Sequence, residues 1–411
     1  MGKTKRRKLH RYIFAGYMIL LALGISGCGS DGETAATDGQ QAGETVQMEE
    51  KEDILTTLCL DIYEKADREG CLNELDTIRQ LVDRFGENGY AAVDAQNQVD
   101  MVCPEQVAVF CEKVEAKEEA EATIVAVTWQ NSFIKYDLQT TEGKVSGTRS
   151  YYHYSDSHLE QTDFGDYTVS SWMYTEDGYL LFSGSWVSEE IYAFTMGNMG
   201  ENVALRVAPL DETCRELNRK YILPISYKKN NMFLIDWSEE DFGELDLYDL
   251  FDILYTHQNG TSAPYTPAGD LSKGTVYEIP EEVFESVIQS GLNMDVDMIR
   301  SKTVYHGDSE TYEYKPRGFY EREYPEEHPF PEVTDYTENS DGTLTLTVHA
   351  VSPYKWTSKV FAHEVVVRPL DNGGVQYVSN HVIPSETNGE PTWYTPRLTA
   401  EEWEEIYGKD Q

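Results

Sequence analysis

Apolar residues recur every three or four positions between residues 51 and 115, which is the spacing of a buried helical stripe. This spacing predicts two helices that are separated near Glu69-Gly70, the second of which ends at Gly86. A third helix is expected from Pro104, because proline is well tolerated in the first turn of a helix. The apolar stripes of the three helices comprise Ile54, Leu58 and Ile62, then Leu72, Leu75, Ile78, Leu81, Val82 and Phe85, then Val107, Val109, Phe110 and Val114.

Beyond residue 116 apolar and polar residues alternate, and β-branched and aromatic residues become frequent. This period of two predicts strands. Glu142-Gly143 and Asp177-Gly178 are expected to form hairpin turns, because glycine readily adopts the positive φ that such turns require. Val203–Val207 should add a strand and Thr213–Tyr221 a short helix. The other predicted strands are Thr123–Trp129, Phe133–Leu138, Lys144–Tyr154, Thr168–Tyr174, Tyr179–Trp186 and Ile191–Thr195.

The acidic segment of residues 236–255 contains many potential metal ligands. Its acids do not alternate around a central glycine with a closing glutamate, so it does not match a calcium loop. Ser238 followed by Asp241 predicts the capped start of a helix, in which acids of the first turn are stabilised by the helix dipole. The buried stripe of this helix would comprise Phe242, Leu245, Phe251 and Leu254.

The remainder of the chain is expected to combine short helices with a β-meander. Residues 256–275 are rich in Gly, Pro, Ser and Thr and predict a loop, and four prolines predict an irregular segment between residues 316 and 331. Helices are predicted at Pro280–Gln289, Val296–Arg300 and Glu401–Tyr407, and meander strands at Leu344–Val351, Val360–Arg368 and Val375–Val382.

These patterns predict an α+β fold in which N-terminal helices are followed by curved antiparallel β-meanders packed on helices. We expect a helical segment at 51–115, an antiparallel β module at 116–235 and a second α+β module with a C-terminal meander at 236–411. A similar Pro-Glu-x-Val sequence starts a helix before a meander at Pro104 and at Pro280, which suggests two cystatin-like or nuclear-transport-factor-like modules. Pro-Glu is also a common helix start, so the similarity can equally arise without duplication.

The N-terminus has the pattern of an export signal. Six basic residues precede an apolar run from Tyr12 to Ile25, which ends in Ile25-Ser26-Gly27-Cys28. A basic region, a short apolar region and small residues before a cleavage point are typical of a secretory signal peptide rather than of a core or spanning helix. Ile-Ser-Gly-Cys resembles the lipobox of bacterial lipoproteins. This resemblance implies that residues 1–27 are removed and that Cys28 carries a diacylglycerol with acyl chains such as palmitate.

Two acyl chains are enough for stable membrane anchoring. We therefore expect the mature protein on the extracytoplasmic face of the cell membrane, with the lipid bilayer as a partner through Cys28. Residues 28–50 contain Gly, Ser, Thr, Gln and acids with almost no residue to bury, and they predict a flexible acidic tether between the anchor and the folded part.

The charge of the chain excludes one class of partner. There are 33 Lys and Arg against 73 Asp and Glu, a formal net charge of −40. Removal of residues 1–27 removes six cations and no acid, so the mature charge would be −46. Such a polyanion repels nucleic acid, and nucleic-acid binding is not expected. A solvated acidic surface accounts for this charge better than a dedicated calcium site.

The cysteines suggest neither a disulfide framework nor a zinc site. With Cys28 lipidated, an odd number remains, and the spacing matches no zinc pattern. Cys59 and Cys71 lie on consecutive predicted helices and could pair, but the expectation for all five is a small buried apolar side chain. The five are Cys59, Cys71, Cys103, Cys111 and Cys214.

Three histidines on successive C-terminal strands are candidate metal ligands. His349 and His363 share a face of the sheet if His349 pairs opposite Phe361, and a slip of one residue separates them. His381 lies on the third strand. Half-buried strand histidines explain the pattern better than a converging site, and no metal or cofactor is predicted.

No catalytic motif is recognisable in the chain. Gly184-Ser185 lacks the second flanking glycine of a nucleophile elbow, and there is neither a His-Glu-x-x-His pair nor a phosphate-binding glycine loop. The run from Tyr151 to Tyr154 could form an aromatic platform for sugars. Tyr152 and Tyr154 share a strand face, however, so both are expected to pack inward.

Three stretches of the chain are similar to an uncharacterised lipoprotein family of clostridia-type Gram-positive bacteria, for which no activity is implied. They are Arg215–Tyr221, Asn231–Phe242 and Tyr377–Pro384. Together with the anchor and the absence of a reaction motif, they favour a non-catalytic module that binds an extracellular protein or glycan. The alternative is an envelope hydrolase that uses carboxylate acid/base chemistry on glycan or peptide. Two buried carboxylates in a concave pocket would favour the hydrolase, and an open sheet face with exposed Tyr and Trp the binding module.

Overall fold

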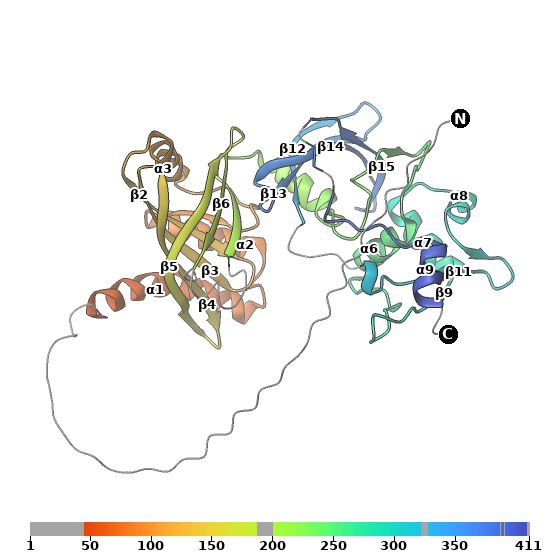
Figure 1. Cartoon of the computed structure of the whole chain (residues 1–411), viewed down its shortest axis with the longest axis horizontal. Coiled ribbons are helices and arrows are strands. Elements are labelled where there is room, and N and C mark those ends of the chain that lie inside the picture. Colours follow the sequence, from red (N-terminus) through yellow and green to blue (C-terminus); the bar gives the residue numbers. More distant parts are fainter. Residues whose placement is uncertain (1–44, 187–199, 322–327, 387, 390, 409–411) are drawn as a thin grey trace, which may run out of the picture. The chain divides into compact units, whose positions relative to one another are not determined.

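The computed structural model describes residues 45–186, 200–321, 328–386, 388–389 and 391–408 (Figure 1). The predicted signal peptide, Cys28 and the predicted strand Ile191–Thr195 lie outside these residues. The described part of the chain is an α+β fold with curled antiparallel sheets, one of which forms a half-barrel. The fold class predicted from the sequence is therefore confirmed.

Three N-terminal helices form where the helical period predicts them. They are α1 (Thr45–Glu69), α2 (Leu75–Glu87) and α3 (Pro104–Ala116). Helix α1 begins inside the segment 28–50 that was expected to be flexible, because an established helix extends at little cost by one hydrogen bond per added residue. Ile54 and Val109 were assigned to buried stripes but are 57 % and 52 % exposed. Val109 lies two residues after buried Val107 and therefore on the opposite side of the helix.

Seven strands form one sheet in the order β1 to β7. Strands β2 to β7 are an antiparallel meander, whereas β1 pairs in parallel with β2. The turn at Glu142-Gly143 has positive φ at both residues, as expected for a tight hairpin. The strands are β1 (Ala91–Asp94), β2 (Ala120–Thr128), β3 (Ser132–Thr141), β4 (Lys144–Ser155), β5 (His158–Tyr174), β6 (Tyr179–Ser185) and β7 (Gly200–Arg206).

Helices cover both faces of this sheet, because alternate strand residues point to opposite sides. On β2, Ile124 and Ala126 pack in the core cluster that contains residues of α3. Val125 and Val127 pack in the other cluster, with α1 and α2. Figure 1 shows α3 running beside β2. The continuous apolar run in β2 is therefore explained by burial on both faces.

The second half of the folded chain contains a five-stranded sheet in the order β12-β13-β14-β15-β8 and a three-stranded sheet in the order β10-β11-β9. The strands are β8 (Trp237–Ser238), β9 (Tyr277–Pro280), β10 (Tyr305–His306), β11 (Thr311–Tyr314), β12 (Phe330–Glu338), β13 (Leu344–Ser352), β14 (Thr357–Pro369) and β15 (Val375–Ile383). The helices are α5 (Glu212–Leu217), the π-helix η1 (Asn218–Ile222), α6 (Leu247–Asn259), α7 (Glu281–Gly291), α8 (Val296–Ser301), the 3₁₀ helix η2 (Phe319–Glu321) and α9 (Ala400–Tyr407).

Six described strands, β1 and β8 to β12, escaped prediction, and β5 is longer than predicted. Strands β8 to β11 have only two to four residues each. Strand β1 has four residues, which is too short for a clear period of two. Strand β12 falls in the segment expected to be irregular because of its prolines. It lies at the edge of its sheet, where Pro331 can be accommodated without the loss of a ladder hydrogen bond. Strand β5 begins at His158 rather than at Thr168.

A buried polar contact joins β6 and β7 of the first sheet to β12 of the second. The hydroxyl of Tyr179 donates to Glu332 Oε1 at 2.6 Å, and Arg206 Nη1 donates to Glu332 Oε2 at 2.5 Å. The side chains of Arg206 and Glu332 are 9 % and 7 % exposed. Leu181, Ala204, Val351 and Phe330 surround this contact.

Candidate functional site

The three C-terminal histidines do not come together. His349 pairs opposite Ala362 and not opposite Phe361, so His349 and His363 point to opposite faces of the sheet. His363 is fully buried, with Nδ1 at 2.7 Å from Asn380 Oδ1 and Nε2 at 2.9 Å from the hydroxyl of Tyr227. Burial lowers the pKa of His363 to about 3, so this ring is a neutral core residue. His381 is exposed beside Asp236.

The cysteines and the tyrosine run are also structural. All five described cysteines are free thiols, so Cys59 and Cys71 do not pair. Cys59, Cys111 and Cys214 are buried, as expected for small apolar side chains, whereas Cys71 and Cys103 are partly exposed. Tyr152 and Tyr154 are 1 % and 2 % exposed, which confirms that they pack inward. Among the described residues no group of three or more His, Cys, Asp or Glu is placed to hold a metal ion.

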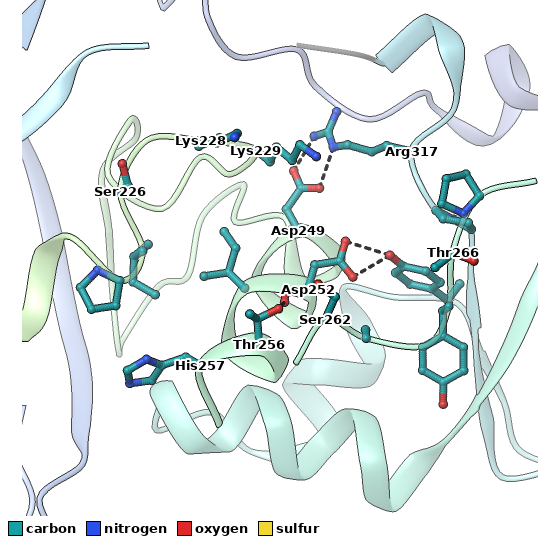
Figure 2. A pocket seen from close by; sticks show the side chains of 18 of the residues that line it. Ser226, Lys228, Lys229, Asp249, Asp252, Thr256, His257, Ser262, Thr266 and Arg317 are labelled. Atoms are coloured by element: carbon teal, nitrogen blue, oxygen red, sulfur yellow. Dashed lines mark hydrogen bonds and ion pairs between the residues drawn. The ribbon is translucent and has the colours of Figure 1, made fainter. Parts of the chain in front are cut away.

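A cavity of about 730 Å³ lies along one side of helix α6 (Figure 2). Five residues of this helix line it: Asp249, Asp252, Ile253, Thr256 and His257. They follow one another at intervals of three, one, three and one, which places them on one face of an α-helix. A volume of this size suits a small molecule or the end of a longer chain.

Three other segments complete the wall of the cavity. The loop 223–229 follows η1, the loop 262–267 follows α6, and Tyr314 and Arg317 lie at and just after the end of β11. The ring of Tyr265 packs at 5.9 Å from that of Tyr314, which gives the cavity an aromatic side. Apolar walls with a few convergent polar groups are the usual composition of a ligand site.

Helix α6 begins later than the sequence predicted. Asp246 caps it, its Oδ1 accepting from the backbone N–H groups of Tyr248 and Asp249 at 3.0 Å each. Ser238, the predicted cap, lies in β8 and its hydroxyl accepts from the backbone N–H of Asp241 at 3.3 Å. Both segments satisfy the local rule for a cap, and only packing decides between them.

Asp249 is the centre of a buried ion cluster behind the cavity. Arg317 donates from Nε to Oδ1 at 2.9 Å and from Nη2 to Oδ2 at 2.5 Å, a two-point contact. Arg397 Nε donates to Oδ1 at 2.7 Å, and the hydroxyl of Tyr394 to Oδ2 at 3.2 Å. The Asp249 side chain is 1 % exposed. A buried carboxylate is tolerated only with such partners.

Asp252 belongs to the same cluster and faces the cavity. The hydroxyl of Tyr314 donates to its two oxygens at 2.6 and 2.8 Å, and Arg397 Nη2 donates at 3.3 Å (Figure 2 draws the Tyr314 contacts). Burial raises the pKa of Asp252, although 39 % of its side chain is exposed toward the cavity. The exposed part belongs to the cavity wall, where neighbouring protein atoms leave the carboxylate less hydrated than on an open surface.

Asp246 lies on the other side of α6. Burial and the neighbouring charge of Asp249 raise its pKa to about 6. Burial alone would lower the pKa of the Arg397 guanidinium, but Asp249 and Asp246 raise it above its usual value. Arg397 is thus a permanent cation beside Asp246 and Asp252, whose carboxyl groups are harder to ionise than usual.

A second cavity of about 680 Å³ adjoins the same cluster from that side. Asp246, Arg397, Tyr394, Tyr248 and Trp403 contribute to its wall. Arg397 contacts the carboxylates of Asp246 at 3.5 Å and of Asp252 at 3.3 Å, and therefore reaches a residue of each cavity. The cluster separates the two spaces and gives both of them a rigid polar wall.

The residues of this site were only partly accessible from the sequence. The acidic run 236–255 was recognised as a helix start and not as a ligand site, and Asp249 and Asp252 were not singled out from the other acids. Arg317 and Arg397 lie about 65 to 150 residues away in the chain from the aspartates that they contact. The spacing of Asp246, Asp249 and Asp252 on one helix was the only local signal.

None of the helices within residues 45–408, apart from the gaps named above, combines the length and the apolar content needed to cross a bilayer. Neither a curated protein nor a solved structure matches the chain. One family model does match, over residues 45–397, a range that contains all three described sheets, helix α6 and the whole ion cluster. Because this match covers most of the sequence, the chain belongs to the family of unknown function DUF6070.

Proposed function

We propose that the protein is a membrane-anchored extracytoplasmic lipoprotein without catalytic activity, and that it binds a ligand in the cavity beside α6. The observation that carries the binding role is this cavity of about 730 Å³, with one helix face, an aromatic side and a rigid ion cluster in its wall. The anchor rests on the basic and apolar N-terminal pattern and on Cys28. The ligand would be a small molecule, or the end of a glycan or protein chain, met outside the membrane.

The hydrolase alternative is favoured by one observation, since two carboxylates, Asp249 and Asp252, line this cavity. Their contacts favour binding. Both oxygens of Asp249 accept from arginines, and both oxygens of Asp252 accept from Tyr314. A general acid or base needs an oxygen that exchanges a proton with the substrate, and these oxygens are already engaged.

The anchor is tested by membrane fractionation of cells that produce the full chain or its Cys28→Ser variant. We expect the parent in the membrane fraction and the variant in the released fraction, because the variant lacks the acceptor thiol. Mass spectrometry of the mature N-terminus should find acylated Cys28. An equal membrane share for both proteins would contradict the anchor.

The cavity is tested with 2-naphthyl compounds as fluorescent probes and with a Thr256→Trp variant that fills the space. Gln258→Trp is the matched control, because Gln258 is an exposed residue of the same helix that does not line the cavity. We expect Thr256→Trp to abolish probe binding and Gln258→Trp to retain it. Cleavage of a 2-naphthyl glycoside or an aminoacyl 2-naphthylamide that Asp252→Asn abolishes would instead favour the hydrolase.

A further inference from the structure

Lys228 and Lys229 are cations at the cavity that have no acidic partner among the described residues. Both line its wall and are exposed, and neither forms an ion pair with any described residue. This is notable in a chain with 73 Asp and Glu and only 33 Lys and Arg. Figure 2 shows the two lysines along the same edge of the cavity as Arg317. Their charge is therefore available to a ligand.

The loop that carries these lysines is held in one conformation. Asn230 is fully buried, and its Nδ2 donates to the carbonyl oxygens of Ile225 at 3.2 Å, Ser226 at 3.3 Å and Lys228 at 3.1 Å. Ser226 and Lys229 have φ values of 55° and 59°, so the backbone turns sharply at both. A loop that is already ordered places its cations without a further entropic cost on binding.

The acids in the cavity wall are already compensated. Arg317 and Arg397 neutralise Asp249, and Arg397 also contacts Asp252. The two lysines therefore add positive charge to a wall whose carboxylates have their own partners. A cationic ligand would meet both lysines and find no free carboxylate, so the wall favours a ligand of negative charge.

Other residues of the wall are apolar. Ile253, Tyr265, Pro267 and Pro316 line the cavity, and the Tyr265 ring is fixed by contact with Tyr314. A flat ring or a short hydrocarbon group buries its surface well against such residues. The cavity thus offers a cationic edge and an apolar body within a single space.

We propose that this cavity binds a small anionic molecule, or an anionic chain end, whose carboxylate or phosphate contacts Lys228 and Lys229 while an apolar or ring-shaped part packs against Tyr265 and Pro316. This inference rests on the proposed binding function and adds the charge class of the ligand.

The experiment uses the purified full chain and four probes that share one ring system: 2-naphthyl phosphate, 2-naphthoate, the neutral 2-naphthamide and the cationic 2-naphthylmethylamine. Binding is measured by fluorescence titration in 50 mM and 500 mM NaCl. At low salt we expect both anions to bind at least about tenfold more tightly than the amide, and the amine more weakly still. The preference should shrink at high salt, because exposed cations are screened.

The variants Lys228→Gln and Lys229→Gln should each lower the affinity for the anions by about threefold to tenfold and leave the amide unchanged. Lys144→Gln is the matched control, because Lys144 is an exposed lysine on β4 that does not line the cavity. Each of the three substitutions removes one positive charge from the molecule. If only the Lys228 and Lys229 variants lose affinity for the anions, the effect comes from a local contact and not from the total charge of the molecule.

Equal binding of all four probes would overturn the proposal of an anionic ligand. The proposed binding role would still stand in that case, provided that Thr256→Trp abolishes the binding of the probes. An effect of Lys144→Gln as large as that of the cavity variants would also overturn the proposal of an anionic ligand. Absence of binding by every probe at millimolar concentration would overturn both proposals.

Discussion

At the scale of single residues, the three aspartates of α6 differ because their surroundings differ. Asp249 is held by two arginines, Asp252 faces a cavity, and Asp246 caps the helix while lying close to Asp249. Burial, and after it repulsion from the neighbouring Asp249 carboxylate, favours the protonated form of Asp246, and its pKa is raised to about 6.

The raised pKa of Asp246 predicts a pH-dependent stability. Between about pH 4 and pH 6, Asp246 keeps a proton in the folded chain that it has lost in the unfolded chain. The contribution of this carboxyl group to stability is therefore fully present below pH 4 and is lost as the pH rises through 6. Asp246→Asn keeps a capping side chain without this titration. As the pH rises from 4 to 7, the free energy of unfolding of Asp246→Asn should therefore increase relative to that of the parent by up to about 3 kcal/mol.

The measurement is urea denaturation at several pH values, with Asp371→Asn as a control at an exposed aspartate. The control should follow the parent across the range. If Asp246→Asn runs parallel to the parent as well, Asp246 does not carry the raised pKa.

At the scale of elements, one close contact within the seven-stranded sheet requires a residue without a side chain. A Cβ built at Gly184 on β6 would lie 2.0 Å from the ring of Tyr167 on β5. Tyr167 is 1 % exposed and packs in the core cluster beneath α3. Gly184 and Ser185 resemble part of a nucleophile elbow, but in the fold the missing side chain of Gly184 leaves room for the Tyr167 ring on the neighbouring strand.

Gly184→Ala should therefore destabilise the fold by about 1–3 kcal/mol, because Tyr167 must move out of a packed core. Gly165→Ala on β5 is the control, since its Cβ would meet its nearest atom at 3.7 Å, an ordinary contact. That substitution should be neutral within about 0.5 kcal/mol. Thermal and urea unfolding of both variants measure the difference, and equal losses would show that Tyr167 is not the cause.

At the scale of the whole folded part, a buried ion pair connects the seven-stranded sheet with the five-stranded sheet. Glu332 on β12 accepts from Arg206 on β7 and from Tyr179 on β6. Burial raises the pKa of Glu332, and Arg206 opposes this. Removing one partner of such a pair leaves the other charge buried without compensation.

Glu332→Gln should cost about 3–5 kcal/mol, because the guanidinium of Arg206 then remains in the interior without a counter-ion. Hydrogen exchange should rise in β6, β7 and β12 before the rest of the fold opens. Glu239→Gln, which removes a partly exposed pair with Arg368, should cost about 1 kcal/mol or less. Equal effects of the two variants would show that the buried pair does not connect the sheets.

Local patterns in the chain predict most of the helices and the long meander strands, but they do not predict which elements pack or pair with one another. The helical stripes of α2, α3 and α7 and the alternation in β3 and β4 follow from 3.6-residue and 2-residue periods. The register of β13 on β14 was left open between two alternatives, because a slip of one residue changes which face is buried and only packing selects it. The predictions for 1–44, including Cys28, remain predictions.

The sequence by itself determined the α+β class, the acidic character of the molecule and the presence of most of its helices and long meander strands, since these depend on neighbouring residues and on composition. Only the tertiary structure decided which aspartate caps α6, which acids acquire arginine partners and where a cavity remains. The physical reason is that Asp249 and Arg397 are 148 residues apart in the chain, so their contact exists only once the whole second half has packed.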